Sequence, residues 1–159
     1  MKVGIIFGSR SDTEKMRGAA RALEIFDIFW EAHILSAHRV PEELGRMIGE
    51  MEERGVKVFI CGAGLAAHLP GVVASKTVLP VIGVPLSAKL DGTDALYSMV
   101  QMPKPVPVAT VGIDNSFNAG MLAVQMLSLG NNHLSRRLLS WREQMRIDFV
   151  ADNGGGVEL

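Results

Sequence analysis

The chain has very little cysteine, no excess of charge of either sign and no metal-ligand spacing, and each absence narrows its possible functions. Cys61 is the only cysteine among 159 residues, so no internal disulfide can form and a reducing cytoplasm is the expected location. The 16 basic and 17 acidic residues leave a net charge of −1, which indicates neither a nucleic-acid surface nor a charged tail. The spacing of His, Cys and Asp residues resembles no metal site.

Membrane and export signals are also missing from the sequence. The uncharged run from Val58 to Ser75 is long enough to raise the question of a membrane span. Its glycines, together with His68 and Pro70, fit a buried strand and a glycine-rich turn better than a hydrophobic helix. The chain passes from Met1 directly into a strand-like run, so we expect no signal peptide.

Apolar residues, by contrast, are plentiful for so short a chain. They make up 48% of the sequence, and the mean hydropathy is +0.23. A chain of this length has a limited interior, so we infer that some apolar surface is buried between subunits. We expect residues 1–150 to form a single domain and residues 151–159 to form a disordered tail.

Strand-like and helix-like segments alternate along the chain. This alternation predicts an α/β three-layer sandwich, in which a parallel sheet has helices on both faces and a further helix follows at the C-terminus. The default strand order for this pattern is the flavodoxin-like order 2-1-3-4-5. The expected strands are Val3–Phe7, a run within Trp30–Leu35, Val58–Cys61, Pro80–Val84 and Val108–Val111.

Helix boundaries are marked by particular residues. Ser11 with Glu14 predicts a capping box, and Asn115 predicts the start of a helix that ends at Gly130. A short helix is expected from Asp91 until Pro103 ends it. The last helix, about 133–150, should carry an apolar stripe of Leu134, Leu138, Trp141, Met145 and Phe149.

The predicted strand order places the loops after the first three strands at one edge of the sheet. The first loop, Gly8–Asp12, opens a helix whose free N–H groups suit an anion, although Ser11 and Asp12 could equally be simple caps. It contains neither the three spaced glycines of a dinucleotide site nor the Gly-Lys-Ser/Thr of a P-loop. Asp12 would repel a phosphate, so it is better suited to accept hydrogen bonds from sugar hydroxyls.

The second and third loops supply groups for proton transfer and phosphate binding. His38 and Arg39 follow the second strand, where imidazole can move a proton and guanidinium can grip phosphate. The third loop, Gly62–His68, offers small residues and a second histidine. Either histidine could instead be satisfied by local backbone. The residues alone indicate a phosphate-bearing, ribose-containing small molecule, but they do not identify the reaction.

The same three loops resemble those of the class I 5-(carboxyamino)imidazole ribonucleotide mutases of purine biosynthesis, the PurE family. The similar motifs are Gly8-Ser9-x-Ser11-Asp12, Ser36-Ala37-His38-Arg39, Gly62-Ala63-Gly64-x-Ala66-Ala67-His68-Leu69-Pro70-Gly71, Gly83-Val84-Pro85 and Asp94 to Pro103. The resemblance runs from about Val3 to Trp141. Leu65 and Pro105 depart from the family pattern, which generally has Gly at both positions.

The resemblance implies a cofactor-free isomerase that assembles as a homo-octamer and moves a carboxylate from an exocyclic nitrogen to carbon 4 of the aminoimidazole ring. It implies that Ser9, Asp12 and Arg39 bind the ribose phosphate and that Ser36, His38 and His68 lie at the reacting base. His38 and His68 are the candidate catalytic residues. Ser11, Ala63, Gly64 and Leu69 complete the candidate substrate-binding set, and no metal is expected.

Three other functions compete with this interpretation. A class II enzyme would carboxylate aminoimidazole ribonucleotide directly, but Arg39 and the His68-Leu69-Pro70-Gly71 motif favour class I. A receiver-type signalling domain would need acidic residues at the strand ends, where this chain has Gly8-Ser9 and Cys61-Gly62. A non-catalytic nucleotide-binding module would share the phosphate loop and stays open.

Overall fold

A computed structural model of the chain describes residues 1–156. A five-stranded parallel sheet has the order β2-β1-β3-β4-β5, so the predicted fold class and strand order are confirmed. The strands are β1 (Lys2–Phe7), β2 (Phe29–Ile34), β3 (Val56–Ala63), β4 (Val81–Pro85) and β5 (Ala109–Thr110). The main helices are α1 (Thr13–Ile25), α2 (Pro41–Glu53), α3 (Leu69–Ala74), α4 (Thr93–Val100), α5 (Ser116–Ser128) and α6 (Asn132–Asn153).

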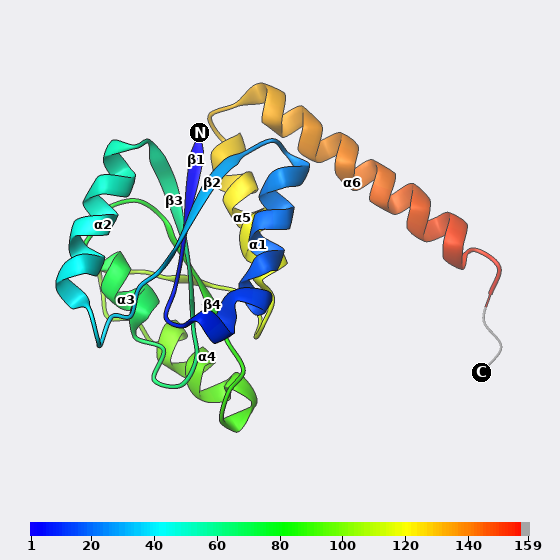
Figure 1. The fold of residues 1–159 in the computed structure, drawn as a ribbon. Coiled ribbons are helices and arrows are strands. Elements are labelled where there is room, and N and C mark those ends of the chain that lie inside the picture. The colour runs from blue at the N-terminus through cyan, green and yellow to red at the C-terminus, as the bar shows by residue number, and fades with distance from the viewer. Residues whose placement is uncertain (157–159) are drawn as a thin grey trace.

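The helices form layers on the two faces of the sheet (Figure 1). α1 and α5 cover one face, and α2 and α3 cover the other. Alternate residues of the central strands point into the two layers: Val58 and Ile60 of β3 pack with α1 and α5, whereas Phe59 and Cys61 pack on the opposite side. Because β1 and β3 are buried on both faces, their sequences are nearly continuous apolar runs.

The largest departures from prediction occur near the fourth and fifth strands. β5 has only two residues rather than the predicted four, and Val111, which the prediction included, lies outside the strand although its N–H donates to the Gly83 carbonyl. The helix expected from Asp91 begins as a short 3-10 turn, Leu90–Gly92, because Gly92 adopts φ +83° and interrupts the helical backbone. The α-helix itself runs only from Thr93 to Val100.

The predicted capping box at Ser11 and Glu14 is wrong. The hydroxyl of Ser9 accepts the hydrogen bond from the Ser11 N–H, so Ser9 caps a 3-10 turn at Arg10–Asp12 that precedes α1. Asn115 does cap α5, since its side chain accepts from the Asn118 N–H. The side-chain cap therefore belongs to the 3-10 turn after β1, and the N-terminus of α1 has no side-chain cap of its own.

α6 extends well away from the rest of the molecule (Figure 1). Leu134 and Leu138 of its predicted stripe are buried and Trp141 packs on the core, but Met145 and Phe149 are exposed. The helix continues to Asn153, past the predicted boundary at Val150, and residues 157–159 of the expected tail lie outside the described residues. Among residues 1–156, no helix combines the length and apolar character that a membrane span requires.

Glu31 on edge strand β2 contacts three basic side chains. Arg54 donates to it at 3.0 Å, His33 lies at 3.2 Å and Lys2 at 3.3 Å. Burial by itself raises the pKa of Glu31, but the hydrogen bonds from Arg54, His33 and Lys2 outweigh it and lower the pKa to about 2. The folded state therefore favours the ionised carboxylate, which ties β2 to β1 and to the end of α2.

We predict that Glu31→Gln lowers the free energy of unfolding by about 1 kcal/mol or less at pH 7, since the partners are partly exposed. The depressed pKa stabilises the fold above the ordinary value of 4.5, and this contribution should fade as the pH falls toward 2. Urea unfolding at several pH values measures the difference, with Glu53→Gln on exposed α2 surface as the control. A difference between Glu31→Gln and wild type that grows on acidification would contradict the assignment.

Candidate functional site

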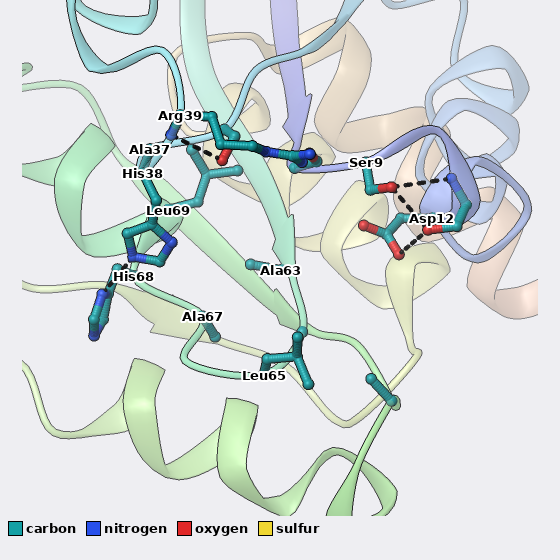
Figure 2. Close-up of a pocket in the computed structure, with 15 residues that line it drawn as sticks. Ser9, Asp12, Ala37, His38, Arg39, Ala63, Leu65, Ala67, His68 and Leu69 are labelled. Atoms are coloured by element: carbon teal, nitrogen blue, oxygen red, sulfur yellow. Dashed lines mark hydrogen bonds between the residues drawn. The ribbon is translucent and has the colours of Figure 1, made fainter.

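The three predicted loops meet at the carboxyl edge of the sheet and line one pocket of about 370 Å³ (Figure 2). The structure places every predicted site residue around it: Ser9, Ser11, Asp12, Ser36, His38, Arg39, Ala63, Gly64, His68 and Leu69. They meet because β1, β2 and β3 are parallel neighbours that end level, with Phe7 opposite both Ile34 and Gly62.

The two histidines contact each other at one end of the pocket. His38 Nε2 and His68 Nδ1 are 2.7 Å apart, and the ring planes meet at 80°. At this separation one nitrogen donates and the other accepts, so the pair can share and pass a proton. His38 follows β2 and His68 precedes α3, so the contact joins two separate loops. The alternative interpretation, in which each histidine bonds only to local backbone, does not describe this pair.

Arg39 joins the second loop to the first. Its Nη2 donates to the Gly8 carbonyl at 2.8 Å, and its backbone N–H donates to the Ser36 hydroxyl at 3.3 Å. α2 begins directly after Val40, with Pro41 in its first turn, a position that proline favours. The guanidinium therefore lies between the histidines and the Ser9–Asp12 turn, where an anionic group of a ligand could meet it (Figure 2).

Asp12 lies at the opposite end of the pocket from the histidines (Figure 2). Burial raises the pKa of its carboxyl group, and the nearby Asp114 adds to this effect. Hydrogen bonds from Ser11 and Ser9 and the charge of Lys15 act in the opposite direction. The carboxylate is an acceptor for hydroxyl groups, and a bound phosphate would be repelled by it.

The pocket wall between these two ends is apolar and built from small side chains. Ala37, Ala63, Ala67 and Ala88 line it, together with Leu65 and Leu69. Ala88, which follows β4, was not among the predicted site residues, because only the loops after the first three strands were expected to meet. Leu65 adopts φ +57° and is 53% exposed, so it lies at the rim of the pocket.

The chain's cysteine and its other two histidines lie outside the pocket. Cys61 is fully buried and burial raises the pKa of its thiol, so it has no nucleophilic role here. His33 contacts Glu31, and His133 lies at the start of α6. Within residues 1–156, no group of three or more His, Cys, Asp or Glu side chains could hold a metal ion. The acidic cluster that a receiver domain requires is therefore missing from this part of the chain.

Known proteins are similar to this chain in sequence and in fold. A family model described as AIR carboxylase matches residues 2–148. The N5-carboxyaminoimidazole ribonucleotide mutase of Pyrococcus abyssi is 51% identical over 146 residues, which cover 91% of this chain and 84% of that protein. The mutase of the same name from Saccharolobus solfataricus is 49% identical over 151 residues, covering 94% of this chain and 96% of that protein.

The similarity extends to the fold. The crystal structure of Treponema denticola PurE matches with a TM-score of 0.87 at 29% identity and covers 96% of each chain. A family match over nearly the whole sequence, relatives at half identity and a shared architecture lead to one conclusion: the chain belongs to the AIR carboxylase family.

Proposed function

We propose that the chain is an N5-carboxyaminoimidazole ribonucleotide mutase of de novo purine biosynthesis, a function carried by its close relatives of that name. The observation in the site that supports it best is the His38–His68 contact beside an alanine-lined wall, with Asp12 and Arg39 at the ribose-phosphate end. A substrate with a charged phosphate, a sugar and a reacting base matches this division of the pocket.

The reaction can proceed by release and recapture of carbon dioxide. The bond between the exocyclic nitrogen and the carboxylate breaks, and a proton from the histidine pair reaches that nitrogen. Carbon 4 of the ring then attacks the trapped carbon dioxide and returns its own proton to the pair. Atoms and charge balance, because the histidine pair donates one proton to the nitrogen and accepts one from carbon 4. The apolar wall keeps both fragments together, which makes recapture effectively unimolecular.

The remaining roles follow the same division of the pocket. Ser9, Asp12 and Arg39 hold the ribose phosphate, and Ser36 lies with the histidines at the base. Ser11, Ala63, Gly64 and Leu69 shape the cavity between them. We place the enzyme in the cytoplasm, which suits its single buried thiol.

Substrate supply tests the proposed function and its two rivals. Purified protein should convert 5-(carboxyamino)imidazole ribonucleotide without ATP, with little turnover of aminoimidazole ribonucleotide and bicarbonate at equal concentrations. Preference for the second pair would indicate a class II carboxylase. Nucleotide binding without turnover of either substrate would indicate a non-catalytic module.

Replacing His38 and Arg39 should have different kinetic effects. His38→Asn removes a group that acts on a moving proton, so kcat should fall by about 10²–10⁴-fold while nucleotide still binds. Arg39→Ala removes a charge-assisted contact remote from the reacting atoms, so KM should rise by about 10–150-fold. Steady-state assays and calorimetry separate the two effects. Near-normal turnover in His38→Asn would show that His38 is not the proton shuttle and would make His68 the candidate.

Replacing Leu65 should have little effect on activity. Its φ of +57° is a conformation that glycine adopts without strain, and its side chain lies at the exposed rim. Leu65→Gly should therefore keep kcat/KM within about threefold of wild type, because no transition-state contact is lost. A larger change in either direction, measured in the same assay, would show that the leucine side chain shapes the bound state directly.

We propose a homo-octamer, with α6 as a contact element. Its outer half carries exposed Met145, Ile147, Phe149 and Val150 on a helix that extends from the core (Figure 1). Light scattering at micromolar concentration should show a species far larger than the 17.2 kDa chain. Phe149→Glu should shift it toward smaller species, and the exposed Arg142→Glu on the same helix should not. A monomeric wild type would refute the assembly.

A further inference from the structure

Three side chains outside the predicted site make a compact cluster beside the pocket: Lys15 of α1, Ser87 after β4 and Asp114 after β5. The ammonium of Lys15 donates to the carbonyl and, at 2.5 Å, to the hydroxyl of Ser87, and it lies 3.4 Å from Asp114 Oδ1. The Ser87 N–H donates to Asp114 Oδ1 at 2.9 Å, and its hydroxyl donates to Oδ2. We refer to these three residues as the clamp.

The backbone of Asp114 is fixed in an unusual conformation that serves these contacts. It adopts φ +55°, in the left-handed region that aspartate tolerates better than most residues. Its N–H donates at 2.8 Å to the carbonyl of Pro85, the last residue of β4. The backbone of Asp114 is thus anchored at Pro85, the end of β4, while its carboxylate accepts hydrogen bonds from Ser87, two residues further along the chain from Pro85.

The segment that the clamp holds forms part of the pocket wall. Residues 86–89 connect β4 to the turn before α4, and Ala88 lines the pocket. A side chain at Gly64, in the third loop, would meet the Leu86 carbonyl at 3.0 Å and Ala88 Cβ at 3.5 Å. The 86–89 segment therefore packs directly against the loop that carries the alanine wall, and a shift of this segment would open that wall.

The clamp also reaches the other end of the pocket through α1. Lys15 lies one helical turn after Asp12, and the buried hydroxyl of Ser116 at the start of α5 donates to the Lys15 carbonyl. The charged groups that act on Asp12 are Lys15, which lowers its pKa, and Asp114, which raises it. Arg39, His38 and His68 line the same pocket. Lys15 therefore offsets Asp114 and helps keep Asp12 ionised.

We propose that Lys15, Ser87 and Asp114 act as positioning residues that fix the 86–89 segment against α1, close the alanine wall and hold Asp12 as the acceptor for the ribose hydroxyls. The inference rests on the proposed function, because it takes the ligand to be a ribonucleotide. None of the three residues lines the pocket itself. They act through Ala88 and Asp12, so the effect should appear in nucleotide binding and its pH dependence.

The test is calorimetric titration with the product, 4-carboxy-5-aminoimidazole ribonucleotide, between about pH 3.5 and 8, a range that begins below the ordinary pKa of an aspartate carboxyl group. Lys15→Met and Asp114→Asn break the clamp from its two oppositely charged sides, and Lys15→Arg keeps the charge. Lys57→Met is a matched control. Lys57 is exposed and lies near the amino end of β3, whereas the pocket lies at the carboxyl ends of the strands. Thermal unfolding checks that each variant is folded.

Both clamp variants should bind the nucleotide about three- to tenfold more weakly at pH 7, the size expected for weakening one hydrogen bond. Their pH profiles should move in opposite directions. Without Lys15 the pKa of Asp12 rises, so affinity should fall at a higher pH than in wild type; without the Asp114 charge it should fall at a lower pH. Lys15→Arg and Lys57→Met should follow wild type in affinity and pH profile, and the kcat of these two control variants should stay within about twofold of wild type.

Mere loosening of the fold would shift both profiles the same way or leave them unmoved, and either result would overturn the proposal. Unchanged affinity in both clamp variants would overturn it as well. Wild-type protein that binds no product nucleotide would instead refute the proposed function. The affinity and pH comparisons among variants are made with the same ligand, so titration of its own phosphate cancels between them.

Discussion

The pocket depends on the parallel pairing of β1 with β2 on one side and β3 on the other. In this register Phe7 lies opposite Ile34 and Gly62, so the three strands end at the same level and their loops leave the sheet together. The ladder continues past the strand ends, because the Leu35 N–H donates to Phe7 and the Leu86 N–H donates to Ala63. A slip of β2 along β1 would separate His38 from His68, which β3 positions.

The loops at this edge are held by individual contacts and carry backbone strain. Leu65 and Ala67 after β3, Leu90 and Asp91 after β4, and Asp114 after β5 all adopt positive φ angles, although none is glycine. Such conformations are costly and persist where the surrounding structure fixes them. Here the fixing contacts are those of Ser98 with the Ala66 carbonyl and of the clamp with the 86–89 segment.

Under the proposed function, the two ends of the pocket have different physical tasks. In the proposed reaction the polar end, with Asp12 and Arg39, binds groups that do not change, so its contribution is to affinity and orientation. The alanine wall and the histidine pair act where bonds change, and an apolar wall suits a neutral gas molecule that must not escape into water. In this proposal, separating the two tasks along one cavity allows a small domain to bind a charged nucleotide and still keep water away from the reacting groups.

The sequence by itself determined the fold and the membership of the site. Alternating apolar runs and helix signals predicted a parallel sheet, because central strands such as β1 and β3 are buried on both faces, and the default order for that pattern matches the observed strand order. The three motif-bearing loops followed from that order, and the ten residues expected there do surround one pocket. Local patterns were weaker at the ends of elements, where Ser9 rather than Ser11 provides the cap and β5 covers only the middle two residues of the predicted strand.

Only the tertiary structure decided which of these groups touch. The 2.7 Å contact between His38 and His68, the donation from Arg39 to Gly8 and the meeting of Lys15, Ser87 and Asp114 join loops that are far apart in the chain. No spacing in the sequence encodes such contacts, because hydrogen bonds depend on direction and on tenths of an ångström. Hydrophobic periodicity specifies which face of an element is buried, whereas the final geometry of polar side chains is set by the packing of all the elements together.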